Sequence, residues 1–328
     1  MCLYPKLIKN RKYIANKKNG GVIPAVSDNR VLYVPAGCGK CIECKKQKAR
    51  EWQVRLHEEI RHDNKGKFVT LTFSNESIKE LANEIKGLKG YDLDNEIATL
   101  ATRRFLERWR KKYKKSVKHW LVTELGGNGT ENIHMHGIIW TNETNETITK
   151  IWKYGYTWIG DKNNGGYVNE RTINYIVKYV NKVDEKHKEY NSKILTSPGI
   201  GKKYIERIDA KENKYKDKET KETYTTRNGI KIALPIYYRN KIYNEEEREK
   251  LWINKLNEET RYICGEKIDI SKGEEKYYKL LEWYRKKNKR LGYGNNEKNW
   301  ELKKYENERR NIKTMTRIAN ANKSKIRK

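Results

Sequence analysis

The chain has 328 residues, and its 73 Lys and Arg residues against 43 Asp and Glu residues give a formal net charge of +30. Hydrophobic residues make up 36% and charged residues 35%, which excludes a membrane protein, a collagen-like chain and a wholly disordered chain. Such a charge requires a polyanionic partner, and nucleic acid is the most common one. Because 11% of the residues are aromatic, we expect a folded protein with surfaces on which bases can stack.

Cysteine usage and apolar runs bear on the cellular compartment. Three of the five cysteines lie in one short run, which is unlike a secreted disulfide scaffold and favours a reducing compartment. Residues 1–12 contain no apolar segment followed by a cleavage site, and apolar runs such as 137–140 are too short to span a bilayer. We therefore expect a cytoplasmic protein without a membrane partner.

The N-terminal region, residues 1–62, is predicted to be a module of strands, a cysteine motif and a helix. Short apolar runs at 13–15 and 31–34, separated by glycines and a proline, indicate strand and turn structure. A helix is predicted over about 43–62 because apolar residues recur there at helical spacing. These residues are Ala49, Trp52, Leu56 and Ile60.

The second region, residues 63–204, alternates between strand and helix patterns. Strands are predicted at 67–73, 120–124, 133–140 and 156–159, and helices at about 96–115, 147–152 and 171–183. The order β-α-β-β-α-β-α is that of the ferredoxin-like split arrangement. The predicted fold class is therefore α+β, with an antiparallel sheet backed by helices.

The third region, residues 205–328, is basic and largely helical in its pattern. A solvated loop or hairpin is predicted at 209–222, and helices at 245–256 and 274–289. Residues 311–328 contain six basic and no acidic residues, so we expect a flexible arm that is disordered or becomes ordered on DNA.

Two histidines two residues apart form the first candidate site. His134 and His136 lie on a predicted strand, so their side chains point to the same face, while Glu124 lies on the preceding strand of the same hairpin. Two imidazoles and a carboxylate leave coordination positions open for water and a phosphate oxygen on Mg²⁺ or Mn²⁺, and zinc is not excluded by ligand type. The alternative is a polar, wet face of a sheet.

The predicted helix at 171–183 carries two stripes on opposite sides. Its apolar residues are spaced to pack on the sheet, while Tyr175, Lys178, Tyr179 and Lys182 share the outer face. A tyrosine hydroxyl is a weak nucleophile at its ordinary pKa of about 10, and nearby lysines or a cation would favour its attack. The alternative is an ordinary amphipathic helix with a solvated face.

A cysteine run forms the third candidate site. Cys38, Cys41 and Cys44 have the spacing of half a zinc knuckle, and a fourth ligand could come from Cys2, His57 or His62. The alternative is a set of reduced, unliganded cysteines at a turn and the start of a helix.

The glycine-containing stretch at 197–203 is not a nucleotide-binding loop. It lacks the Gly-x4-Gly-Lys-Ser/Thr pattern, so the chain has no recognisable ATPase and strand unwinding would need a host helicase. Its backbone N–H groups could bind a DNA phosphate, or the stretch could be a simple turn.

Together these motifs resemble those of the HUH endonucleases that initiate rolling-circle replication, and most of all the initiators of microviruses of the gokushovirus branch. The resemblance covers roughly residues 30–205 and rests on five stretches in family order. They are Cys38–Cys44 followed by Trp52, Phe68–Thr72, Glu124–His136, Tyr175–Lys182 and Ser197–Gly201.

The resemblance implies a metal-dependent tyrosine endonuclease and strand transferase. Family members nick one strand of the viral DNA at the origin, forming a 5′-phosphotyrosyl link and a free 3′-OH for the host DNA polymerase. A second tyrosine takes part in closing the circle. By position, Tyr175 and Tyr179 match the nucleophiles, His134 and His136 the metal ligands, Glu124 a third ligand, and Lys178 a lysine that contacts phosphate or stabilises the phenolate.

Two other classes of function are weighed against this one. Charge and aromatic content alone would also suit a non-enzymatic nucleic-acid-binding or packaging protein. Another HUH enzyme is the second alternative. The second tyrosine argues against single-tyrosine transposases, and the order of the motifs argues against relaxases, which commonly place their tyrosine near the N-terminus.

Overall fold

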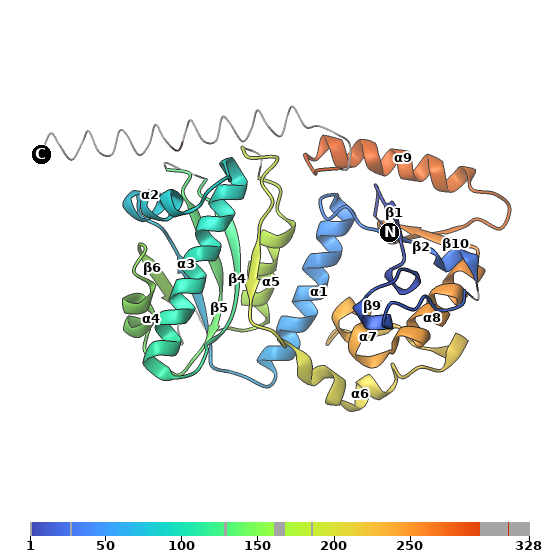
Figure 1. Cartoon of the computed structure of the whole chain (residues 1–328), viewed down its shortest axis with the longest axis horizontal. Coiled ribbons are helices and arrows are strands. Elements are labelled where there is room, and N and C mark those ends of the chain that lie inside the picture. The colour runs from blue at the N-terminus through green and yellow to red at the C-terminus, as the bar shows by residue number, and fades with distance from the viewer. Residues whose placement is uncertain are drawn as a thin grey trace, which may run out of the picture. The chain divides into compact units, whose positions relative to one another are not determined.

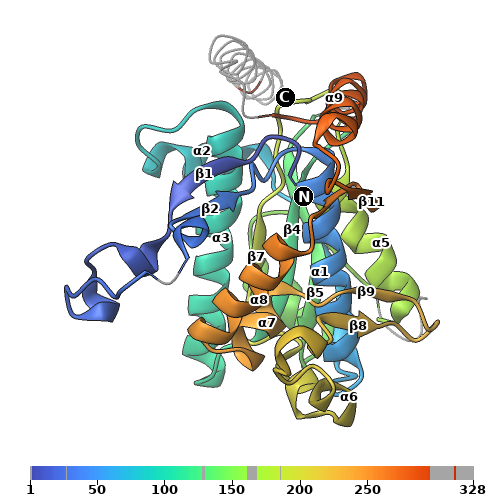
Figure 2. The same ribbon diagram turned by 90° about the vertical axis from the view of Figure 1, so that its right-hand side faces the viewer.

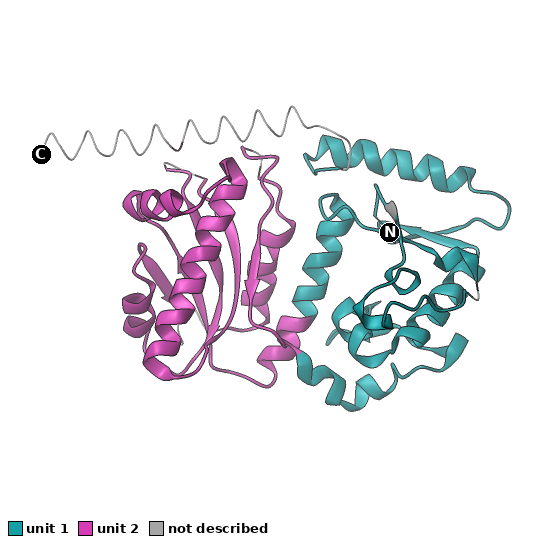
Figure 3. Cartoon of the chain, viewed as in Figure 1, with its two compact units in different colours: residues 1–54, 202–297 teal, residues 55–201, 298–328 magenta. Residues whose placement is uncertain are grey.

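The computed structural model describes residues 2–26, 28–127, 130–160, 168–184, 186–295 and 314. They form two compact units, and the chain passes between the units at Val54–Arg55 and at Gly201–Lys202 (Figure 3). We call residues 55–201 the sheet unit, and residues 2–54 with 202–295 the cysteine unit. The division into regions 1–62, 63–204 and 205–328 remains a prediction. Apart from Thr314, the predicted basic arm lies outside the described residues, as do Asn128 and Gly129 of the predicted turn.

The sheet unit is a mixed α+β structure, as predicted. Its strands are β3 (Gly66–Leu71), β4 (Lys118–Leu125), β5 (Ile133–Trp140), β6 (Thr157–Gly160) and β7 (Ile194–Thr196). Its helices are the end of α1 (Ile42–Ile60), α2 (Asn75–Glu84), α3 (Gly90–Tyr113), α4 (Asn145–Trp152) and α5 (Glu170–Asn181). Helix α2 and strand β7 are absent from the sequence-based prediction, and α3 begins earlier than predicted.

The described strands of this unit form one five-stranded sheet in the order β6-β3-β5-β4-β7, with antiparallel neighbours throughout. Strand β5 lies between β3 and β4, so these two strands run parallel to each other without touching. Helices α2, α3 and α4 lie on one side of the sheet and α5 on the other (Figure 1). This arrangement leaves the end of the β4–β5 hairpin facing the polar side of α5.

Strand alternation separates the two faces of the sheet. One face packs on α3 and α4 through a large apolar core that includes Val69, Met135 and Phe105. On the other face the buried side chains of Trp120, Val122 and Ile138 lie towards α5. Gly137 faces the core side, where a Cβ would lie 2.0 Å from the carbonyl oxygen of Trp120, so this close approach of β5 to β4 requires glycine.

The cysteine unit combines short hairpins with helices. Its strands are β1 (Lys6–Lys9), β2 (Tyr33–Ala36), β8 (Thr223–Thr225), β9 (Lys231–Ala233), β10 (Thr260–Ile263) and β11 (Glu266–Asp269), paired as β1-β2, β8-β9 and β10-β11 (Figure 2). Its helices are most of α1, α6 (Ile208–Lys211), α7 (Ile236–Ile242), α8 (Glu245–Asn257) and α9 (Glu275–Arg290). The apolar run at 13–15 forms no strand. Its first residue ends a 3-10 turn, Arg11–Tyr13, that the side chain of Asn10 caps.

Candidate metal centre and tyrosine pair

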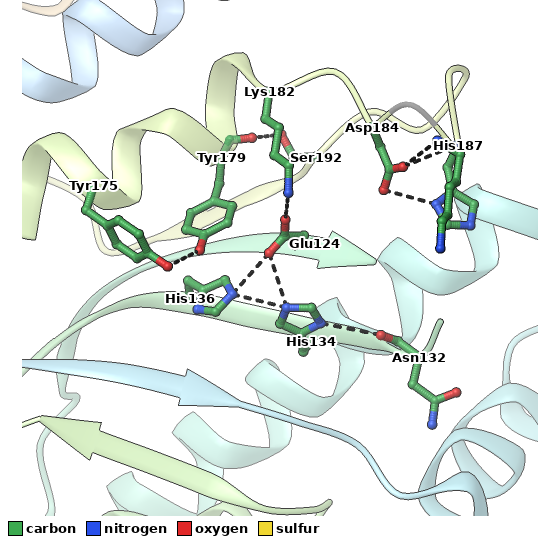
Figure 4. A network of polar contacts seen from close by, with 11 residues as sticks. Glu124, Asn132, His134, His136, Tyr175, Tyr179, Lys182, Asp184, His187 and Ser192 are labelled. Carbon is green, nitrogen blue, oxygen red and sulfur yellow. Dashed lines mark hydrogen bonds and ion pairs between the residues drawn. The ribbon is translucent and has the colours of Figure 1, made fainter. Parts of the chain in front are cut away.

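The residues of the predicted metal site lie together on the α5 side of the sheet. Glu124 of β4 is paired in register with His134 of β5, and alternation brings His136 to the same face. One carboxylate oxygen, Oε2 of Glu124, lies 3.2 Å from Nε2 of His134 and 3.1 Å from Nε2 of His136. The two Nε2 atoms are 3.1 Å apart (Figure 4). Three donor atoms therefore converge on one point.

This donor set fits a divalent cation. Adjacent ligands of an octahedral cation with bonds of about 2.1 Å lie about 3 Å apart, which is the spacing of the three atoms here. A carboxylate with two imidazoles on one side of the ion leaves further positions open to water and substrate oxygens. The geometry alone does not select the ion.

The second nitrogen of each imidazole is also engaged. Nδ1 of His136 lies 3.0 Å from the hydroxyl oxygen of Thr70, which faces it from β3. Nδ1 of His134 lies 3.4 Å from the carbonyl oxygen of Asn132. A proton on each Nδ1 leaves each Nε2 lone pair free for a cation, so these contacts select the ligating tautomer.

Charges around the carboxylate keep it ionised. Burial by itself would raise the pKa of Glu124, but hydrogen bonds from His134, His136 and Lys182 hold that pKa well below its ordinary value. Nζ of Lys182 donates to Oε1 of Glu124 at 2.6 Å, which raises the pKa of Lys182. Burial lowers the pKa of His136, which favours the neutral imidazole that a metal needs. The triad is therefore in the protonation state of a metal site at neutral pH.

Helix α5 presents two phenols above this centre. Asn169 caps its N-terminus in a capping box with Thr172, and its apolar face is buried as predicted. The Tyr179 ring stacks on the imidazole of His136, with centroids 4.4 Å apart and planes 12° apart. The Tyr179 hydroxyl donates to that of Tyr175 at 2.7 Å (Figure 4). Burial and this hydrogen bond raise the pKa of Tyr179. Both phenols thus lie beside the cation ligands.

The two lysines of the outer stripe differ in their surroundings. Lys178 is exposed, and among the described residues its side chain makes no polar contact. Lys182 instead joins the centre through Glu124, although sequence reasoning gave it no role beyond its place in the stripe. Its spacing of three residues from Tyr179 on one helix face was the available signal.

The predicted cysteine motif also gathers its members. The Sγ atoms of Cys2, Cys38, Cys41 and Cys44 lie within 4.8 Å of one another, and Cys2 is the residue that completes the group. Sγ of Cys2 is 3.9 Å from that of Cys41, and Sγ of Cys38 is 4.0 Å from that of Cys44. Four thiolates around a tetrahedral ion with bonds of about 2.3 Å are about 3.8 Å apart, so this group fits a metal.

Backbone donors support that interpretation. The N–H groups of Tyr4 and Cys38 point to Sγ of Cys2 at 3.3 and 3.2 Å, and the N–H of Cys41 points to Sγ of Cys38 at 3.2 Å. Such donors stabilise thiolates, the form that binds metal.

The stretch at 197–203 has a structural explanation. Ser197 exchanges backbone and side-chain hydrogen bonds with His119, and the N–H of Gly201 donates to Oε2 of Glu59 at 2.6 Å. Because a carboxylate already occupies that N–H, the geometry favours the turn over the phosphate-binding loop.

Comparison with known proteins agrees with the class indicated by the motifs. Residues 66–184 match the family model of replication-associated proteins of the ORF2 type, and they include the triad and both phenols. The replication-associated protein ORF2 of Spiroplasma virus 4 is 26% identical over 278 residues, which cover 76% of this chain and 82% of that protein. The replication-associated protein VP4 of Bdellovibrio phage phiMH2K is 27% identical over 232 residues, covering 65% and 69%. No solved structure matches the chain.

The resemblance to replication initiators of microvirus-like phages is thereby confirmed. In the described part of the chain, every helix is too short or too polar to cross a bilayer.

Proposed function

We propose that this protein initiates rolling-circle replication of a small single-stranded DNA virus by nicking DNA at the origin. The sheet unit is then an HUH endonuclease core of the ferredoxin-like type, since its strand order places β5 between β3 and β4. One observation carries the proposal. A carboxylate–imidazole triad suited to a divalent cation lies in direct contact with two tyrosines one helical turn apart.

The chemistry follows from these groups. The oxygen of one tyrosine attacks the scissile phosphorus, and the new O–P bond forms as the bond from phosphorus to O3′ breaks. The phenolic proton passes to solvent, and the departing O3′ takes up a proton to become the free 3′-OH. Mg²⁺ or Mn²⁺ held by Glu124, His134 and His136 supplies positive charge beside the phosphate oxygens. Lys178 contributes a further charge towards the phosphate, and the second tyrosine serves the later strand transfer.

The cysteine group is proposed to hold a structural Zn²⁺. Thiolates are soft ligands that favour zinc over Mg²⁺ or Mn²⁺, and four of them leave no open position for substrate. The two metal sites thus have separate roles, one catalytic and one structural.

The proposal extends to partners and location. The substrate is single-stranded DNA at a replication origin, and the host supplies the helicase and the DNA polymerase that uses the free 3′-OH. The site of action is the cytoplasm of a bacterial host cell. The relatives that support this carry the names of phage and virus replication-associated proteins.

A covalent-adduct assay tests the proposal. Labelled single-stranded DNA fragments tiled across the encoding genome are incubated with the protein and Mn²⁺, and adducts are resolved on denaturing gels. We expect an adduct that requires divalent cation and disappears in the Tyr175→Phe, Tyr179→Phe double variant. Tyr156→Phe, which alters an exposed tyrosine outside the triad, is the matched control and should retain the adduct.

The same assay separates the competing functions. A packaging protein would bind the fragments without forming an adduct, and His134→Ala would leave its binding unchanged. An adduct that persists in the double variant would refute the two tyrosines as nucleophiles.

A further inference from the structure

A row of aromatic side chains leads from the edge of the sheet to the two phenols. The register pairs Thr70 of β3 with His136 on one side and with Trp158 of the edge strand β6 on the other. Trp158 therefore lies on the face of the sheet that carries the imidazoles. Between Trp158 and the phenols stands Phe68. Its ring meets Trp158 edge-on at 5.4 Å between centroids and Tyr175 edge-on at 6.0 Å.

This row remains accessible. Of their surface, Trp158 exposes 38% and Tyr175 exposes 47%, although tryptophan side chains are on average highly buried. The neighbouring Ile159 points to the opposite face and joins the apolar core, to which Trp158 does not belong. An exposed aromatic surface beside a reactive centre is characteristic of a binding site.

We propose that a nucleobase of the single-stranded DNA, close to the phosphate that is cut, stacks on Trp158 with Phe68 beside it. The two centroid distances place the Trp158 ring at most about 11 Å from the Tyr175 ring, the length of about three stacked nucleotides. An aromatic face accepts any base, so Trp158 sets the path of the strand without reading its sequence. Bases in a duplex are already stacked and paired, so the surface fits a single strand.

This inference rests on the proposed function, but binding tests it apart from cleavage. Anisotropy of a fluorescein-labelled oligo(dT) of ~20 nucleotides is measured without added Mg²⁺ or Mn²⁺. We expect Trp158→Ala to raise Kd about 10-fold or more, and Trp158→Phe to restore most of the affinity because it keeps an aromatic face. Trp158→Leu keeps the apolar bulk without that face and should bind as weakly as Trp158→Ala.

The matched control is Tyr33→Ala, which removes an exposed aromatic ring from strand β2 and should leave Kd unchanged. Normal oligo(dT) affinity in a folded Trp158→Leu or Trp158→Ala protein would overturn the proposal. Equal losses in Trp158→Phe and Trp158→Leu would also overturn it, because they would indicate a packing role.

A second arm locates the contact. The strand that the protein cuts is prepared with single abasic sites around the cut. One abasic position within about three nucleotides of the cut should raise KM for the wild-type protein but not for Trp158→Ala. Equal losses in both proteins at every position would contradict the stacking. If the wild-type protein cuts no strand, the proposed function fails, while the binding arm still decides the role of Trp158.

Discussion

The imidazole of His136 is held from three sides, and one of those contacts is open to a simple test. Its Nε2 faces the cation position, its ring stacks on Tyr179, and its Nδ1 meets the hydroxyl of Thr70 at 3.0 Å. Partners of this kind orient a metal-binding imidazole and raise its basicity. Thr70 is therefore a positioning residue for the metal site rather than a ligand.

We expect Thr70→Val to weaken Mn²⁺ binding at this site about 10-fold, because valine keeps the shape of threonine but removes the hydrogen-bond partner. Titration of Mn²⁺ followed by electron paramagnetic resonance measures the affinity directly. Thr70→Ser restores a hydroxyl and should bind nearly as tightly as the wild-type protein. Equal affinity in the valine and serine variants would show that the hydroxyl has no such role.

At the scale of the element, the β4–β5 hairpin depends on one glycine. A Cβ on Gly137 would lie 2.0 Å from the carbonyl oxygen of Trp120 and 2.8 Å from Cα of Leu121, both of which are backbone atoms. We expect Gly137→Ala to lower the free energy of unfolding by about 4 kcal/mol or more, measured by urea denaturation. Gly127→Ala, where a Cβ would meet no atom within 4 Å, should change it little. A small loss in Gly137→Ala would contradict the observed register.

The outer end of β4 carries a titratable group that links stability to pH. His119 is buried beside Ser197, with Nδ1 3.0 Å from the serine hydroxyl oxygen, and burial lowers its pKa. The unfolded chain then binds a proton near pH 6.5 that the folded chain does not, so the free energy of unfolding falls as pH drops below about 6.5. For one proton the loss is at most about 1.4 kcal/mol per pH unit.

Urea unfolding at two pH values, one above and one below about 6.5, tests this contribution. We expect His119→Asn to reduce the loss of stability at the lower pH, because that variant has no imidazole to protonate. The same pH dependence in both proteins would assign the effect to other histidines, such as His136.

Elements with a strong two-sided pattern could be predicted from the sequence. Strand β5 has the predicted bounds 133–140, and α5 shows both of its stripes, because burial on one side and chemistry on the other impose a clear period. Helix α2 was missed because it buries only Ile78 and Leu81 in an otherwise polar segment. Strand β7 was missed because three residues are too few to show a period.

The same reasoning explains which site residues could be found. Glu124 could be predicted because it is close in sequence to the histidines across a hairpin. The roles of Thr70 and Trp158 depend on strand register between distant segments, which local patterns do not contain. Lys182 could be placed on the right face of α5, but its partner Glu124 is 58 residues away.

At the scale of the whole molecule, the basic chain contains two metal-binding groups, one in each unit. The cysteine group lies in an apolar cluster with Leu3, Ile42 and Leu281, so its metal would tie segments from both ends of the unit's sequence. In such a unit the free energy of metal binding adds directly to the stability of the fold.

We expect about one zinc per chain in the purified protein, measured by elemental mass spectrometry. Cys41→Ser should lose this zinc and lower the unfolding temperature, because one of four ligands is removed. Cys264→Ser alters a cysteine of the same unit outside the group and should keep both. Zinc retained in Cys41→Ser would rule out the four-cysteine site.

Helix α5 is anchored and reactive at once, since Ile173, Ile176, Val177 and Val180 fasten it to the sheet while its opposite side bears the phenols. Trimming a methyl from those anchors would therefore tilt the nucleophiles away from their target well before it unravelled the domain. A mild loosening, by heat or by a conservative core change, would leave a protein that still looks intact by spectroscopy yet no longer cuts. Evolution of this surface is consequently constrained from beneath as strictly as from above.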